Sequence, residues 1–311
     1  MVGMKTTISL YELLRKFPDE RAARLHIESV RWKGEPTCPK CHAKSRIQTR
    51  KVEGYYRCLA CKLDFTVRTG TIFERSHIPL DKWLCAMYLI NTERKGISSL
   101  QLAQQLGITQ KSAWFLLQRI REACSNKSGD DDDFLGGIVE VDEAYVGGKE
   151  TNKHESKKLC AGRGTVGKTA ILGMRERGGR LAATVISGTS VAVIQGHVKK
   201  KLKPGATLCT DEHSAYVGMP EFMHLSVRHS AKKFVDGMAH TNGIESVWAV
   251  LKRGFYGVYH SFSVKHMQRY VDEFVYRLNE GKCANLTMDR IDGMLGRVAG
   301  NRITYRLLTA K

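Results

Sequence analysis

The chain has 311 residues, of which 42% are hydrophobic, a content that is ordinary for a globular protein and excludes wholesale disorder. Its 50 lysines and arginines outnumber the 31 aspartates and glutamates, and the formal net charge of +19 favours a polyanionic partner over a surface that is basic only for solubility. No apolar run approaches the roughly 18 residues of a membrane span, and the N-terminus lacks the apolar core of a signal peptide. We therefore expect a soluble, intracellular protein with reduced cysteines and no membrane contact.

Two helical regions are predicted near the N-terminus. Residues 7–32 carry apolar side chains at the spacing of one helix face, namely Leu10, Leu13, Leu14 and Phe17. Residues 81–95 form a second helical region.

Between them, four of the nine cysteines occur as two Cys-x-x-Cys pairs. Cys38 and Cys41 form the first pair, Cys58 and Cys61 form the second, and 16 residues lie between the pairs. This spacing predicts a tetrahedral four-thiolate site for a structural Zn²⁺, in a ribbon of short hairpins over residues 35–68. A redox motif would explain one pair and leave the other without a role. The remaining cysteines are expected to be small buried hydrophobic residues: Cys85, Cys124, Cys160, Cys209 and Cys283.

A helix–turn–helix is predicted over residues 96–123. Gly107 ends the first helix and Thr109 can cap the second. The apolar stripe of the first helix is Ile97, Leu100, Ala103 and Leu106, and that of the second is Ala113, Leu116 and Ile120. Polar Gln110, Lys111 and Ser112 begin the second helix, where base-reading side chains would lie. An ordinary helical hairpin would show the same stripes, so only the basic surroundings favour contact with DNA.

The segment 125–134, with four consecutive aspartates at Asp130–Asp133, is predicted to be a solvated linker rather than a metal site. Beyond it, strands and helices alternate. Strands are expected at 138–146, 169–176, 181–187, 206–210 and 224–230, a helix at 191–202, and further helices from near Asn242 and Val264. Three antiparallel strands, a helix, a parallel strand and more helices describe an α/β domain of the ribonuclease H-like type, a mixed sheet flanked by helices. In that arrangement the first and fourth strands are adjacent.

Three acidic residues lie in settings that suit a catalytic metal site. Asp142 lies near the end of the first strand of this domain, Asp211 follows the fourth strand, and Glu245 begins a helix. The first two are separated by 68 residues and the last two by 33. Two-metal phosphoryl chemistry needs hard oxygen ligands that converge on ions about 4 Å apart. Adjacent strands and a later helix can bring the three carboxylates together.

Each acid also has an ordinary structural explanation. Asp142 could point to solvent from a half-exposed strand, as Glu140 on the same face could. Asp211 could be the N-cap of a helix in the following segment EHSAY. Glu245 fits a capping box in which Asn242 is the cap and Glu245 reaches back. The order, element types and spacing of the three acids favour one shared site over three unrelated roles.

The helix of Glu245 adds a basic residue to this pattern. Its core-facing stripe is Ile244, Val247, Trp248, Leu251 and Phe255. Lys252 follows Glu245 by seven residues on nearly the same face. A carboxylate for a metal and a cation for a phosphate suit a DNA terminus, although Lys252 could also be an ordinary surface lysine.

These residues carry a resemblance to a known family. The chain resembles bacterial insertion-sequence transposases of the Asp-Asp-Glu class, specifically the ISXO-like group with an N-terminal zinc ribbon. The matching stretches cover most of residues 20–280 and are CPKC…CLAC, VEVDEAYVGGK, TDEHSAY and HTNGIESVWAVLKRGFYGVYHSFSVKHMQRYVDEFVYRLN. The resemblance implies that Asp142, Asp211 and Glu245 are the metal-binding triad and that Lys252 is the associated basic residue. It also implies a multimer that pairs two DNA ends.

The leading hypothesis is a DNA transposase that works in the cytoplasm, on the bacterial nucleoid. The triad would hold two Mg²⁺ ions, or Mn²⁺ in their place, to nick the element ends and to join the freed 3′-hydroxyls to target DNA. The zinc ribbon and the helix–turn–helix would recognise terminal inverted repeats in double-stranded DNA. A regulator that has lost catalysis and a nuclease that cleaves without joining are the alternatives.

Residues 162–169 match the nucleotide-binding pattern GxxxxGK[ST], but that motif requires a preceding strand and a following helix. Here the preceding segment is polar and the following one reads as a strand. A basic loop that touches the DNA backbone explains its cations better: Lys157, Lys158, Arg163 and Lys168.

The predicted division of the chain is 1–70, helix and ribbon; 71–128, helix–turn–helix region; 134–285, catalytic domain; and 286–311, basic C-terminal tail.

Overall fold

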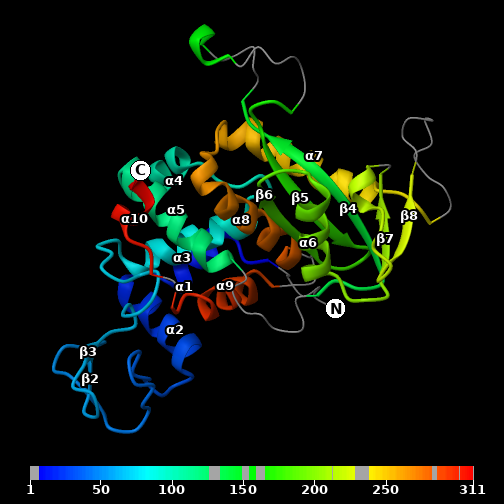
Figure 1. The fold of residues 1–311 in the computed structure, drawn as a ribbon. Coiled ribbons are helices and arrows are strands. Elements are labelled where there is room, and N and C mark those ends of the chain that lie inside the picture. The colour runs from blue at the N-terminus through cyan, green and yellow to red at the C-terminus, as the bar shows by residue number, and fades with distance from the viewer. Residues whose placement is uncertain are drawn as a thin grey trace, which may run out of the picture. The chain divides into compact units, whose positions relative to one another are not determined.

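The computed structural model describes residues 7–125, 134–148, 154–158, 165–211, 213–227, 238–281, 286–300 and 302–310. Its contacts divide the chain into two units, one formed by Met1–Ser125 with Glu280–Lys311 and the other by Asn126–Asn279 (Figure 1). The predicted linker aspartates Asp130–Asp133 and the cysteines Cys160 and Cys283 lie outside the described residues.

The first unit begins with two helices where the sequence predicts a single helical region. Helix α1 spans Leu10–Lys16 and α2 spans Glu20–Trp32. Pro18 separates them, because a proline disfavours helical backbone in the residue before it. Of the predicted face, Leu13 and Phe17 are buried, but Leu14 is 50% exposed and so does not share their buried face.

The predicted ribbon is confirmed as three short antiparallel strands. Strand β1 spans Ile47–Thr49, β2 spans Tyr56–Cys58 and β3 spans Asp64–Phe65, in the order β1-β2-β3. Their apolar side is an aromatic cluster in which the Trp32 ring contacts Tyr56 and Phe65 edge-on, with centroid distances of 5.2 and 6.0 Å. So few residues bury little apolar surface, which is why such a module depends on a metal.

Three further helices complete the N-terminal part: α3 (Leu80–Thr92), α4 (Ser99–Leu106) and α5 (Gln110–Cys124). The predicted helix pair is confirmed as a backbone arrangement, since Gly107 ends α4 with a φ of 60° and the Thr109 side chain caps α5. All three predicted residues of the α5 stripe are buried. In α4, however, Leu100 is 61% exposed and Leu102, about 200° further around the helix, is buried in its place.

The C-terminal segment, which the sequence analysis treats as a separate tail, packs into this same unit. Helix α9 (Thr287–Gly296) contacts α2, α3 and α5, and a short helix α10 (Tyr305–Thr309) follows. The buried Arg119 guanidinium of α5 donates hydrogen bonds to the carbonyls of Ile72 and Ile303, at 2.8 and 3.2 Å. A buried charged side chain requires hydrogen-bond partners. Here the partners are backbone carbonyls, so Arg119 connects segments that are distant in sequence.

The second unit is built on a five-stranded sheet in the order β6-β5-β4-β7-β8. The strands are β4 (Ile138–Val146), β5 (Thr169–Glu176), β6 (Leu181–Ile186), β7 (Thr207–Thr210) and β8 (Met223–Ser226). Strands β4, β5 and β6 are antiparallel neighbours, whereas β7 pairs parallel with β4 and β8. The predicted adjacency of the first and fourth strands is therefore confirmed.

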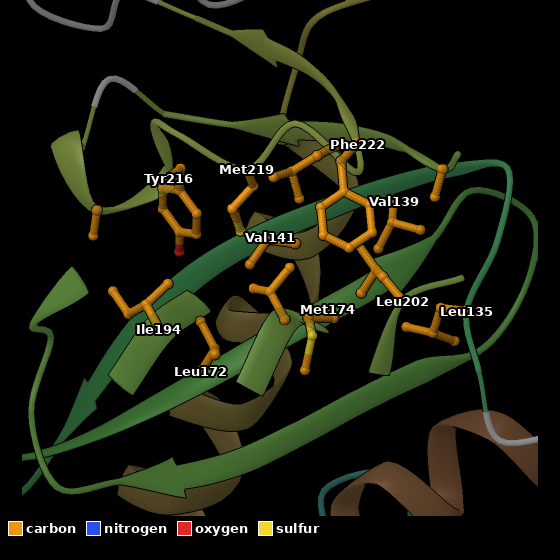
Figure 2. Close-up of a cluster of buried hydrophobic side chains, with 14 of the residues drawn as sticks. Leu135, Val139, Val141, Leu172, Met174, Ile194, Leu202, Tyr216, Met219 and Phe222 are labelled. Atoms are coloured by element: carbon orange, nitrogen blue, oxygen red, sulfur yellow. The ribbon is translucent and has the colours of Figure 1, made fainter. Parts of the chain in front are cut away.

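Helices cover both faces of this sheet (Figure 1). Helix α6 (Val191–Lys201) packs on one face, where Ile194 meets Val141, Leu172 and Met174 in a buried cluster (Figure 2). Helices α7 (Asn242–Gly254) and α8 (Met267–Glu280) cover the other face, and the predicted stripe of α7 is buried there. Alternate residues of β4 and β5 enter the two clusters, as the period of a strand requires.

Helix α8 also covers the open edge of the sheet. The Asn279 side chain bonds the main-chain N–H and C=O of Leu181 at 2.8 and 2.9 Å. The Gln268 carbonyl accepts from the N–H of Val185 at 2.7 Å. These side chains satisfy edge groups of β6 that could otherwise pair with another chain.

None of the helices in the described part of the chain is long and apolar enough to cross a bilayer.

The packing of the C-terminal segment predicts a stability effect. Ile291 of α9 is fully buried, so Ile291→Ala should lower the free energy of unfolding of the first unit by about 2–4 kcal/mol. Leu307, which is 61% exposed in the same segment, is the matched control, and Leu307→Ala should change it by less than about 0.5 kcal/mol. Urea unfolding of both variants would measure the difference. Equal, small changes in the free energy of unfolding for the two variants would mean that the C-terminal segment does not pack into this unit.

Candidate active site

The sheet brings Asp142 and Asp211 to the same place. Asp142 lies in β4, and Asp211 directly follows β7, which pairs parallel with β4. Glu140 pairs with Cys209 in that register, so two residues further along each strand the two aspartates are neighbours. Their negative charges act on each other, which is one reason why the pKa of Asp142 is raised.

Asp142 does not point freely into solvent. Its side chain lies on the sheet face covered by α7, and the Trp248 indole Nε1–H donates a hydrogen bond of 3.0 Å to its Oδ2. Burial is the main cause that raises the pKa of this carboxyl, to about 6, with smaller contributions from the charges of Glu143 and Asp211. A hydrogen bond from the backbone of Glu143 opposes the shift. A cation would relieve the repulsion that this site concentrates.

Glu140, on the same face of β4, is a structural residue that the sequence analysis treats only as a solvent-facing neighbour. Its side chain is buried, and it accepts from the N–H of Ile244 at 2.9 Å and from Arg177 Nε at 2.8 Å. It therefore satisfies an amide in the first turn of α7, where helices leave donors without partners. The signal was an acid at an inward position of a half-buried strand, which requires a fixed partner.

Glu245 lies in the first turn of α7, with its side chain exposed. The N-cap residue of α7 is Thr241 and not Asn242, and its side chain makes no capping hydrogen bond, so the capping box considered for Asn242 and Glu245 is not formed. The Thr241 hydroxyl instead donates to Glu245 Oε1 at 2.9 Å. Among the described residues, the group of ligand atoms close enough to share an ion is the cysteine cluster. Glu245 is thus on the covering helix of the site, but its carboxylate is not gathered with the two aspartates around a single point.

Asp211 is held by its own loop. Its Oδ1 accepts from the N–H of His213 at 3.0 Å. The N-cap residue of the short helix that follows is His213, so the N-cap role considered for Asp211 is wrong. The short helix Ser214–Tyr216 follows, and the Tyr216 hydroxyl donates to Glu143 Oε1 at 2.5 Å. Burial raises the pKa of Glu143, as does the charge of Asp211. This contact between the residue after Asp142 and the loop after Asp211 is not visible in the sequence, because it joins residues that are 73 positions apart.

Lys252 is exposed on α7, seven residues after Glu245 and therefore about 10 Å further along the helix. The other basic candidate, Lys168, directly precedes β5 and is partly buried. Because a strand follows Lys168, the requirement of the nucleotide-binding motif for a helix is not met. Lys158 pairs with Glu155 at 2.5 Å, whereas Arg163 and the side chain of Lys157 lie outside the described residues.

The predicted base-reading residues lie at the first turn of α5. Gln110 and Lys111 are exposed and Ser112 is partly buried. Gln110 Nε2 donates to Ser99 Oγ at 2.8 Å, and Lys111 Nζ lies 4.7 Å from the centre of the Tyr305 ring. Both side chains thus contact their own unit in this structure.

The four predicted zinc ligands converge. The sulfur atoms of Cys38, Cys41, Cys58 and Cys61 all lie within 4.8 Å of one another. The Cys38–Cys61 and Cys41–Cys58 sulfur pairs are 3.5 Å apart, close to the roughly 3.8 Å edge of a Zn–S tetrahedron. Backbone N–H groups, chiefly that of Cys61, lower the pKa of Cys58 to about 6. The N–H of Ala43 acts likewise on Cys41, but desolvation and hydrogen bonds with the other thiols raise its pKa to about 12.

The other cysteines that the structure describes, Cys85, Cys124 and Cys209, are buried, as expected.

Comparison with known proteins matches two parts of the chain to family models. A family model described as the ISXO2-like transposase domain matches residues 134–279, and one described as the transposase zinc-ribbon domain matches residues 18–64. A protein of Halobacterium salinarum, described as an uncharacterized protein in transposable element ISH50, is 28% identical over 254 residues. That similarity covers 77% of this chain and 84% of the relative.

The raised pKa of Asp142 predicts how stability depends on pH. The pKa of an unfolded aspartate is about 3.9. In the folded metal-free protein it is about 6. Between these values the folded state binds more protons, so this group lowers stability as pH rises from about 4 to about 6, with the full cost above that. Asp142→Asn removes the charge and keeps an oxygen for Trp248, so it should stabilise the metal-free protein by roughly 1–3 kcal/mol at about pH 8.

Thermal unfolding without added divalent cations would measure this effect at about pH 5 and about pH 8. Asp289→Asn, at an exposed position of α9, is the control and should leave Tm nearly unchanged at both. Destabilisation by Asp142→Asn to the same extent at both pH values would contradict the account.

The cysteine cluster predicts one tightly held zinc per chain. Cys58→Ser should lower the zinc content measured by elemental analysis and unfold the ribbon, because structural zinc binding contributes on the order of 10 kcal/mol to folding. Cys85→Ser removes a buried thiol of α3 in the same unit and should leave the zinc content unchanged. Full zinc content in the Cys58→Ser protein would rule out the four-thiolate site.

Proposed function

We propose that Asp142, Asp211 and Glu245 form a metal-dependent site for cutting and joining DNA. The chain belongs to the ISXO2-like transposase family and carries its zinc ribbon. The observation that carries the proposal is the strand order. It makes β4 and β7 parallel neighbours, which supports a shared site for Asp142 and Asp211, and the helix that bears Glu245 packs on β4 and β5. A ribonuclease H-like domain is supported by the antiparallel strands β4 to β6, by the parallel strand β7 and by the helices on both faces of the sheet.

The donor set fits hard divalent cations. All three side chains offer carboxylate oxygens, which Mg²⁺ prefers over nitrogen or sulfur, and the mutual repulsion at Asp142 favours a cation. In this proposal Asp142 and Asp211 hold the ions from the sheet, and Glu245 joins them when its carboxylate leaves the Thr241 hydroxyl. Two bound Mg²⁺ ions, or Mn²⁺, supply an activated water and charge stabilisation at the scissile phosphate.

The chain's own residues also account for how DNA is held. Lys252, exposed on the same helix as Glu245, is placed to contact the phosphate of a DNA terminus. Gln110, Lys111 and Ser112 begin the second helix of a proposed helix–turn–helix, and Lys168 adds a backbone contact near β5. Gln110 and Lys111 would exchange their intramolecular contacts for DNA. The net charge of +19 supports a long polyanionic partner.

The ribbon offers a further surface for DNA at the turn between β1 and β2. Its one acid, Glu53, already pairs with Arg21 and Arg24 at 2.9 and 2.7 Å. Next to this turn is a hollow of about 490 Å³, lined by Arg50, Lys51, Val52, Tyr55, Tyr56 and Asp64. Exposed aromatic and basic side chains together suit a nucleic acid, and we propose that this surface and the helix pair recognise terminal inverted repeats. Pairing of two such ends would require a homo-oligomer.

The function is tested by incubating the purified protein with Mg²⁺, labelled element-end DNA and a target plasmid, and by scoring nicking and joining separately. Wild type should do both. Asp142→Asn, Asp211→Asn and Glu245→Gln should each lose on the order of a hundredfold or more in both steps while still binding DNA, because each would remove a ligand of the ions. Asp289→Asn is the matched control and should retain activity.

The outcomes separate the alternatives. Nicking without joining would indicate a nuclease, and DNA binding without either step would indicate a regulator. If only the Glu245→Gln protein kept full activity, the third ligand would have to be reassigned, with Asn242 as the neighbouring polar residue of α7.

A further inference from the structure

One contact to the proposed active site comes from a residue so far assigned only to the core-facing stripe of α7. Trp248 is 4% exposed, and its indole Nε1–H donates to Asp142 Oδ2 at 3.0 Å. It lies three residues after Glu245, so the two side chains are neighbours on the surface of α7. Resting on the metal-dependent function proposed above, we infer that Trp248 is a positioning residue that fixes which oxygen of Asp142 faces the bound cation.

The sheet is shaped to admit this ring. Asp142 of β4 pairs with Gly173 of β5. A Cβ atom at position 173 would lie 2.4 Å from Trp248 Cζ2 and 2.5 Å from Cη2, so no side chain fits there while the indole keeps its place. The ring packs over β5 and its N–H reaches the acid on the neighbouring strand. The close approach of the indole ring therefore explains the glycine at position 173. The backbone there does not have the positive φ that favours glycine elsewhere.

The chemistry of the contact gives the indole its proposed role. A carboxylate has two oxygens and can rotate, so without a second partner it presents either of them to a metal. The indole is a donor only, and it occupies Oδ2, which leaves Oδ1 for the cation. Such outer partners orient ligating groups, and their loss typically weakens metal binding by about 10–100-fold.

A buried indole requires an acceptor, but a backbone carbonyl or a water would satisfy it equally well. In this structure the acceptor is the strand acid of the proposed triad, and the donor is on the helix of the third acid. The contact thus holds the Asp142 side chain in a fixed orientation relative to Glu245.

The test is the Mn²⁺ affinity of the full-length protein, measured from the electron paramagnetic resonance signal of free Mn²⁺. Trp248→Phe keeps an aromatic ring and removes the N–H, so it should weaken binding by about 10–100-fold. Gly173→Ala keeps the N–H but displaces the ring and should weaken binding too. Trp114→Phe, in the other unit, is the control and should bind as wild type does.

A second measurement on the wild-type fold covers the case in which these variants fail to fold. The chain has four tryptophans, so ¹⁵N-indole labelling gives four N–H signals. Asp142→Asn should move one of them, and Mg²⁺ added to wild type should move that same signal. Mn²⁺ affinities within twofold of wild type in folded variants, or four indole signals that Mg²⁺ leaves in place, would overturn the inference. If wild type binds no Mn²⁺ at all, it is the proposed function that fails.

Discussion

A buried carboxylate, that of Glu140, joins strand β4 to the first turn of α7, and the candidate active site depends on this joint. Glu140 accepts from the N–H of Ile244 and from Arg177, so the beginning of the helix is fixed over the centre of the sheet. Removing one partner of such a buried pair typically costs about 3–5 kcal/mol. The helix that it fixes carries Glu245, Trp248 and Lys252, and therefore the geometry of the proposed site follows from one strand-to-helix contact.

The two aspartates are positioned by the sheet itself. Asp142 gains its place from the pairing of β4 with both β5 and β7, and Asp211 from the end of β7. Tyr216 then ties the loop after Asp211 back to Glu143 on β4. Carboxylates brought together in this way repel one another and lose hydration, which is costly for the metal-free fold. The same cost favours a cation, so the proposed affinity for metal and the expected instability of the metal-free fold would have one physical origin.

The sequence predicted the adjacency of the first and fourth strands, the cysteine ribbon and the buried stripe of α7, because periodicity and ligand spacing are local signals. It failed where distant segments meet. The alternation of β4 did not reveal that Glu140 is buried, since its partners Ile244 and Arg177 are remote in sequence. Leu100 was misassigned because the phase of a two-turn helix is poorly defined. The packing of residues 286–310 into the N-terminal unit was missed because their basic composition resembles that of a tail, although Ile291, Ile303 and Leu308 are buried.

The central claim is that Asp142, Asp211 and Glu245 hold metal ions together. A crystal structure of the protein with Mn²⁺, read by the anomalous scattering of that metal, tests it most directly. The account predicts anomalous peaks bounded by the three carboxylates, about 4 Å apart if two ions bind, with Glu245 turned away from Thr241. Well-ordered carboxylates with no peak between them, or a Mn²⁺ ion bound elsewhere in the catalytic unit, would contradict it.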